Sequence, residues 1–153
     1  MSGSSFKRLC SLVVGAAVIA CAVQAATPAE TQKARHEHYE KLGDAFKAVR
    51  DQSNAGSPDF AALQKAANTV QEASVNQQQW FPKGSGPEAG KTRALPEIWT
   101  DTAGFASAMK MFEERAPALA AAAQAKDVDA VKKAFREVGG SCKNCHDKFR
   151  APE

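Results

Sequence analysis

The most constraining feature of this 153-residue sequence is a regular row of apolar side chains between residues 127 and 149. Apolar residues recur there every three or four positions, the spacing that places side chains on one face of an α-helix. We therefore expect a helix from about Asp127 whose buried face carries two cysteines. The row consists of Val128, Val131, Phe135, Val138, Cys142, Cys145 and Phe149.

Three earlier segments show the same helical spacing. They are residues 28–52, residues 58–79 with Ser57 and Pro58 as cap and first residue, and a segment from Pro96 that Pro117 should bend near Glu113. Their predicted inward side chains are Tyr39, Leu42, Phe46 and Val49 in the first, Phe60, Leu63, Ala67 and Val70 in the second, and Ile98, Phe105, Met109, Phe112 and Leu119 in the third.

Residues 80–95 separate the second and third of these segments and have no helical period. Prolines and glycines are concentrated there, which predicts a long loop with several tight turns. Runs of Val, Ile and Thr that would suit strands are absent, and alanine is abundant. The pattern therefore predicts an all-α fold, an antiparallel four-helix bundle, with ligand sites between its helices.

The N-terminal residues 1–25 read as a secretion signal, with a basic start followed by an apolar run. Cleavage after Ala25 would leave one domain over residues 26–153 and place the protein in the periplasm. A competing interpretation makes Cys21 the acylated residue of a lipoprotein, the one case in which we expect a membrane attachment. After removal of the signal, 18 basic and 17 acidic residues remain, so the formal charge falls from +3 to +1. A net charge this small does not create the positive electrostatic potential that attracts nucleic acid.

Cys142, Cys145 and His146 form the C-x-x-C-H pattern of c-type haem attachment. Two intervening residues on a helix bring both thiols to one side, where they can form thioethers with the haem, and the histidine can then ligate iron. C-x-x-C alone also suits a dithiol redox pair or half of a zinc site. The redox pair expects strands that this chain lacks, and the zinc site would need His36 or His38 as further ligands.

The chain resembles the class II c-type cytochromes, and most closely the cytochrome c prime family, over essentially residues 26–153. Three stretches carry the resemblance: residues 138–147 around the haem motif, residues 96–99 followed by Asp101, and the early Arg35. The resemblance implies up-down-up-down topology, one covalently bound haem c near the C-terminal end of the bundle, and His146 as the proximal ligand. It implies that the first helix covers the opposite, distal face.

Position 39 decides the chemistry that the resemblance implies. Methionine-ligated members carry methionine four residues after the position of Arg35, whereas this chain has Tyr39. A ring there would leave iron five-coordinate and high-spin, open only to diatomic gases such as nitric oxide or carbon monoxide, and its hydroxyl could touch the bound gas. The expected function is gas binding with some capacity for electron transfer, not enzymatic turnover. The alternative is a low-spin electron carrier with a sixth protein ligand.

The remaining expected haem contacts also follow from the resemblance. Arg35 and Thr92 are expected at the haem propionates, and Arg150 is expected to stack beside His146 on a continuing helix. His36 stands where the family usually has glutamine, so it could contact a propionate or ligate iron. The resemblance also implies a homodimer formed through the first two helices. We expect a redox partner as well, whose identity the sequence does not give.

Overall fold

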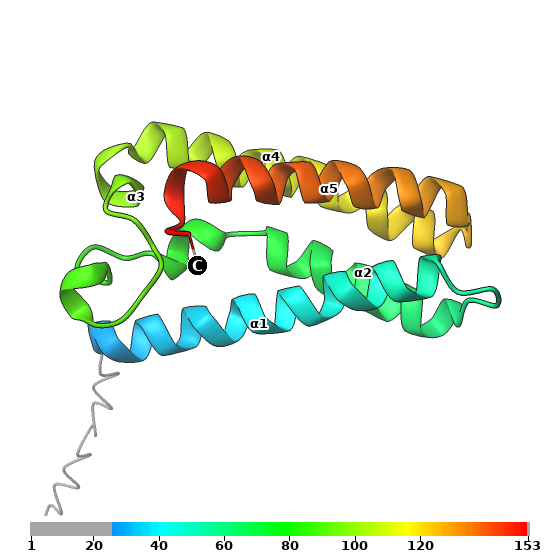
Figure 1. Cartoon of the computed structure of the whole chain (residues 1–153), viewed down its shortest axis with the longest axis horizontal. Coiled ribbons are helices and arrows are strands. Elements are labelled where there is room, and N and C mark those ends of the chain that lie inside the picture. Colours follow the sequence, from blue (N-terminus) through cyan, green and yellow to red (C-terminus); the bar gives the residue numbers. More distant parts are fainter. Residues whose placement is uncertain (1–25, 153) are drawn as a thin grey trace, which may run out of the picture.

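The computed structural model describes residues 26–152, which fold into helices joined by short connections and one long loop (Figure 1). The predicted signal peptide, residues 1–25, lies outside the described residues. The elements are α1 (Pro28–Ser53), α2 (Phe60–Ser74), the 3₁₀ turns η1 (Gln77–Trp80) and η2 (Pro87–Ala89), the short α3 (Glu97–Thr100), α4 (Thr102–Gln124) and α5 (Val128–Phe149).

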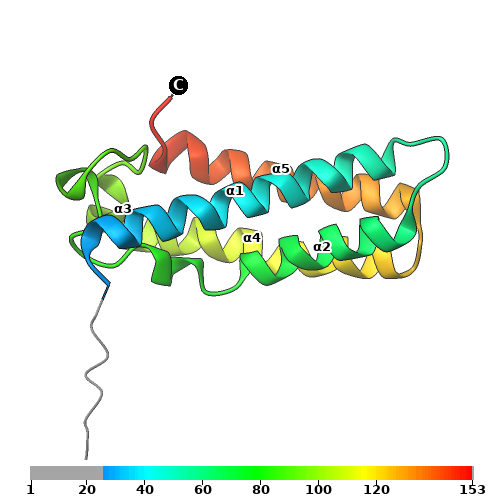
Figure 2. The ribbon, with the colours of Figure 1, turned by 90° about the horizontal axis from the view of Figure 1, so that it is seen from below.

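The four long helices, α1, α2, α4 and α5, run alternately in opposite directions and form one bundle (Figures 1 and 2). Helix α1 packs closely on α2, α2 on α4, and α4 on α5, whereas α1 and α5 make the sparsest contact of these neighbouring pairs. The predicted antiparallel four-helix bundle is confirmed. In the part of the chain that is described, no helix is long and apolar enough to cross a membrane.

The second helix begins later and ends earlier than the sequence predicts. Its cap is Asp59, not Ser57, because the Asp59 carboxylate accepts hydrogen bonds from the backbone N–H groups of Ala61 and Ala62 at 2.9 and 3.1 Å. An aspartate satisfies the free N–H groups of a first turn as well as a serine does, so the two caps competed. The helix stops at Ser74, and the residues up to Trp80 form the separate turn η1.

The third predicted helix is divided, but not where proline suggests. The break lies at Asp101, whose carboxylate accepts a 2.9 Å bond from the N–H of Gly104 and so starts α4. The bend expected from Pro117 near Glu113 does not divide the helix, since α4 continues through Pro117 to Gln124. Proline removes one backbone donor from the helix, and here the surrounding packing of α4 on α2 and α5 outweighs that loss.

The apolar interior consists of two clusters. The main core runs along the bundle between all four long helices and includes fully buried Val49, Leu63, Val70, Leu119 and Val138. A second cluster lies where α3, α4 and the end of α5 meet, and its buried members are Ile98, Phe105, Ala108, Met109 and Phe149. The inward rows predicted for the third and fourth helices supply all the buried members of the second cluster except Ala108. In the main core they supply Phe112, Leu119, Val131 and Val138.

The loop between α2 and α4 gathers at the same end of the bundle as the start of α1 and the end of α5 (Figures 1 and 2). It is fastened to the chain end by backbone bonds. The N–H of Leu95 donates to the carbonyl of Phe149 at 3.0 Å, and the N–H of Ala151 donates to the carbonyl of Arg93 at 2.8 Å. Ala94 and Arg150 form an antiparallel bridge between them. This end therefore brings together the residues that the sequence predicts around the haem.

Candidate haem site

The two cysteines lie three residues apart on the inner face of α5, and both are free and half-buried. Cys142 packs against the main core, whereas Cys145 packs against the second cluster. The pair therefore lies at the junction between the two clusters. As predicted from the apolar row, both thiols face the interior of the bundle.

Burial decides the state of these thiols in the polypeptide itself. It raises the pKa of the Cys142 thiol, and it raises the pKa of Cys145 to about 11, with Cys142 adding to the shift. A dithiol redox pair needs a thiol whose pKa is lowered, because the thiolate is the nucleophile. The environment therefore argues against redox exchange at this C-x-x-C pair.

His146 follows directly, in the last turn of α5. Partial desolvation, then the cations of Arg150 and Arg93, lower the pKa of its imidazole, and Asp147 opposes them. A lower pKa favours the neutral ring, which is the form whose nitrogen can ligate a metal. The zinc alternative finds no further ligands: in residues 26–152 no group of three or more His, Cys, Asp or Glu side chains could hold a metal ion.

Arg35 lies on the inner face of α1 and is only 4% exposed. Its Nη1 donates to the carbonyl of Trp80 at 3.1 Å and to Ser85 Oγ at 3.0 Å. Its Nη2 donates to the carbonyl of Ser85 at 2.9 Å and to Thr92 Oγ1 at 3.3 Å. The guanidinium also lies 4.6 Å from the centre of the Phe81 ring. The structure thus brings Arg35 and Thr92 together, and Arg35 holds the loop against α1.

The acceptors around Arg35 are all uncharged oxygens. Among residues 26–152 no carboxylate forms an ion pair with this buried guanidinium, and burial lowers its pKa. A buried cation is costly unless an anion compensates it. An anionic group such as a propionate could therefore neutralise the charge of the Arg35 guanidinium.

Tyr39 lies one turn further along α1, half-buried in a group of aromatic rings. Its ring meets Trp80 edge to face at a centroid distance of 5.2 Å and lies 6.2 Å from Phe81. Desolvation, followed by electrostatic interaction with Cys145, raises the pKa of its phenol. Tyr39 therefore stays a neutral phenol and shares a neighbourhood with the two cysteines. Its hydroxyl donates to Gln77 Oε1 at 3.3 Å, so it already has a protein partner.

Two predicted residues are placed differently from expectation. His36 does not join the cluster: its side chain is 73% exposed and lies 3.3 Å from Glu40 Oε1. Arg150 does not stack on a continuing helix, because α5 ends at Phe149 and Arg150 has extended backbone opposite Ala94. The bridge to the loop replaces the further helical turn. Arg150 still lies near enough to His146 to affect the pKa of the imidazole.

Several residues at this end were missed from the sequence. Among them are Trp80, which meets Tyr39, and Phe81, which connects Tyr39 to the second cluster. The Phe81 ring lies 6.2 Å from Trp99 and 5.0 Å from Phe105. Ser85 was missed as well, although it is buried and accepts from Arg35. The concentration of aromatic residues in a loop was the available signal, since aromatic rings seldom stay in solvent.

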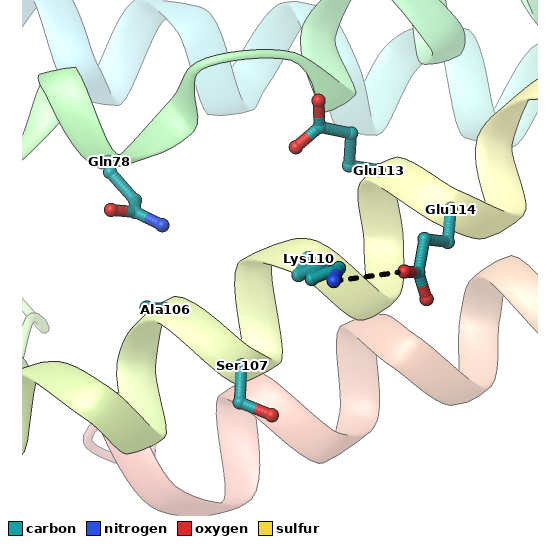
Figure 3. A pocket seen from close by; sticks show the side chains of 6 residues that line it. All are labelled: Gln78, Ala106, Ser107, Lys110, Glu113 and Glu114. Carbon is teal, nitrogen blue, oxygen red and sulfur yellow. Dashed lines mark ion pairs between the residues drawn. The ribbon is translucent and has the colours of Figure 1, made fainter.

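A surface pocket with a volume of about 550 Å³ lies elsewhere, over α4 beside Gln78 (Figure 3). Ser107, Lys110 and Glu114 line it, and Lys110 and Glu114 pair at 3.6 Å. None of the predicted site residues borders this pocket. Its charged lining differs from the apolar, thiol-bearing junction near α5, so it is not the candidate haem site.

The residues of the junction fit a covalently bound haem. They supply two thiols on one helix face, an exposed imidazole in the last turn of the same helix, a buried cation with no ion pair among residues 26–152, and aromatic rings for a flat apolar group. The sparse contact between α1 and α5, which carry Tyr39 and the cysteines, is consistent with a group that lies between these helices.

A family model described as Cytochrome C' matches residues 30–150. The chain belongs to the cytochrome c' family. Cytochrome c' from Rubrivivax gelatinosus is 31% identical over 124 residues, covering 80% of this chain and 95% of that protein. Members of the cytochrome c' family carry haem c with its iron, so the predicted family and cofactor are both confirmed.

Solved structures of cytochrome c' agree with this fold. Variants of the protein from Alcaligenes xylosoxidans match with TM-scores of 0.75 and 0.74, each at 29% identity. They cover 85% and 84% of this chain and all of theirs, and they hold nitric oxide and carbon monoxide respectively. Another cytochrome c', described as having an unusual ligand-controlled dimer dissociation, matches with a TM-score of 0.78 at 27% identity, over 84% of this chain and all of its own.

Proposed function

We propose that this protein is a periplasmic mono-haem cytochrome that binds small diatomic gases at five-coordinate iron. Cys142 and Cys145 would hold the haem through thioethers, and His146 would supply a nitrogen ligand to its iron. When bound, haem c supplies an iron centre that can take one gaseous ligand or exchange one electron. The observation that carries the proposal is Tyr39, a half-buried neutral phenol on α1 in the neighbourhood of the cysteines.

The protein residues set the selectivity of this site. The Tyr39 ring, in the neighbourhood of the two cysteines, would cover the gas-binding side of the haem, and a phenol is a poor ligand for ferrous iron. Arg35 and Thr92 hold the propionates, since the buried guanidinium lacks an anionic partner among the described residues. The Arg150 cation lowers the pKa of the His146 imidazole and so favours its neutral form. The nitric oxide and carbon monoxide complexes of the Alcaligenes protein support diatomic gases as ligands here.

The function proposed is binding, not turnover. A haem peroxidase needs an acid-base group on the distal side, and His36, the nearest candidate in the sequence, faces solvent beside Glu40. Electron transfer remains within reach of any haem iron, although a carrier gains from two strong axial ligands. The redox partner is unknown. We also propose a homodimer, which the dimer described for a related structure supports and which sedimentation would test.

Titration of the reduced protein with carbon monoxide and nitric oxide tests the gas-binding function. We expect saturable binding of one gas molecule per chain. The change in the haem absorption bands measures this binding. The control is the oxidised protein, in which ferric iron should take up little carbon monoxide. Absence of any carbon monoxide binding by the ferrous protein would overturn the proposal.

Export to the periplasm is proposed from residues 1–25, which lie outside the described part of the structure. The mass of the intact protein purified from the periplasm should equal a chain that starts at Ala26 plus one haem. No lipid should be attached. A mass that instead fits a chain beginning at acylated Cys21 would make the protein a membrane-anchored lipoprotein.

A further inference from the structure

Gln77 is a buried glutamine within a run of three. It is 3% exposed, whereas its neighbours Gln78 and Gln79 are exposed. The preceding Asn76 has left-handed backbone, with φ of 58°, a conformation that asparagine tolerates better than most residues. At Asn76 the chain leaves the direction of α2 and begins η1, in which the Gln77 side chain is buried. Burial of an amide is costly unless both of its ends find partners.

Both ends of the Gln77 amide are bonded. Its Nε2 donates to the carbonyl of Ala73 at 2.7 Å, which fixes the orientation of the amide. Its Oε1 then accepts from the hydroxyl of Tyr39 at 3.3 Å. The hydroxyl of Tyr39 is thus joined to α2 through a side chain that itself cannot turn without losing its bond to Ala73.

The Tyr39 ring is held mainly by packing, with Trp80 edge-on at 5.2 Å and Phe81 at 6.2 Å. Packing contacts are not directional, so they leave the ring able to swing, whereas a hydrogen bond fixes its far end. We infer that Gln77 is the positioning residue that keeps the Tyr39 ring over the distal side of the haem and so slows the entry of gas. The inference rests on the proposed function.

The size of the effect follows from what a gas molecule must displace. If the ring swings aside on ligand entry, the bond between Tyr39 and Gln77 breaks in every binding event. A hydrogen bond of this kind contributes about 0.5–1.5 kcal/mol net, so removing it should speed carbon monoxide association by roughly two- to tenfold. Part of the kinetic barrier to gas entry therefore comes from Gln77 in η1, although the ring that blocks entry belongs to Tyr39 on α1.

The substitution Gln77→Met tests this inference. Methionine keeps the length of the side chain but cannot accept a hydrogen bond from the phenol as the amide oxygen does. It can fit because Gln77 borders a groove of about 230 Å³ beside Met109. Gln79→Met is the matched control, since Gln79 is exposed on the same turn. We expect a two- to tenfold faster association of carbon monoxide in Gln77→Met and an unchanged rate in Gln79→Met.

The double variant with Tyr39→Phe separates positioning from a general loosening of the fold. Phenylalanine keeps the ring but has no hydroxyl to lose, so Gln77→Met should have no further effect on association in that background. If Gln77→Met accelerates binding equally with Tyr39 and with phenylalanine, the inference is wrong. An unchanged rate in the single variant would also overturn it.

A second readout does not depend on gas binding. The chain contains one tyrosine, so the tyrosine bands in ultraviolet resonance Raman spectra report on Tyr39 alone. We expect these bands to show loss of a donated hydrogen bond in Gln77→Met and no change in Gln79→Met. Identical bands in the wild type and Gln77→Met would refute the link. If the ferrous protein bound no carbon monoxide, the proposed function would fail while these bands still decided whether Gln77 holds Tyr39.

Discussion

Replacing Cys142 and Cys145 together with alanine should leave a polypeptide that loses all of its haem to acidified organic solvent. In the wild type the haem should instead stay with the chain on a denaturing gel. The reason is that two thioethers are the only covalent links proposed, and both thiols lie on the inner face of α5 with no disulfide between them. Each single variant should retain haem through one remaining link. Haem staining of the denatured chain measures the result.

Lys143→Ala provides the matched control for this experiment. Lys143 lies within the same C-x-x-C-H motif, but its side chain is exposed and pairs with Asp147 at 2.5 Å. An exposed ion pair contributes little to stability, so this variant should keep its covalent haem at the wild-type level. Haem that remains bound to the denatured double cysteine variant would refute attachment at these two residues.

Replacing Tyr39 with alanine should speed carbon monoxide association by at least about tenfold, because a ligand would no longer displace a packed ring worth more than about 1.4 kcal/mol. The same variant should be less stable by about 2–3 kcal/mol, at or below the lower end of the ~3–5 kcal/mol lost by fully buried aromatic rings, since Tyr39 is half-buried. Flash photolysis measures the association rate, and denaturant unfolding measures the stability.

Two further substitutions show which property of Tyr39 matters. Tyr39→Phe keeps the ring but loses the bond to Gln77, so it should speed association by the same two- to tenfold as Gln77→Met. Tyr39→Met should move ferrous iron toward low spin and suppress gas binding. His36→Ala is the neighbouring control, because His36 is exposed on the same helix. Carbon monoxide rates that are equal in the wild type and Tyr39→Ala would show that the ring does not guard the site.

The helices of the bundle could be predicted from the sequence because their apolar rows are long and regular. In α5, the inward positions of Val131, Val138 and Phe149 are all buried, and the cysteines between them share that face. Helix boundaries were harder to predict. Ser57 and Asp59 are both good caps two residues apart, and only the contacts of the folded chain select Asp59.

The loop side of the site could be predicted only through family resemblance. Arg35 and Thr92 are 57 residues apart, and no periodicity relates them, yet Arg35 donates to Thr92 in the fold. Gln77 could not be singled out, because it stands in a run of identical residues and becomes buried only through the left-handed turn at Asn76. The end of α5 depended likewise on a contact distant in sequence, the bridge between Ala94 and Arg150.

The coordination state of the ferrous iron tests the central claim most directly. Resonance Raman spectra of the reduced wild-type protein, recorded without added ligand, distinguish five-coordinate high-spin haem from six-coordinate low-spin haem. With Tyr39 over the distal side and His36 in solvent, we expect five-coordinate high-spin iron with His146 as its single protein ligand. A low-spin, six-coordinate spectrum that becomes high-spin in His36→Ala would contradict this account, because it would place His36 on the iron.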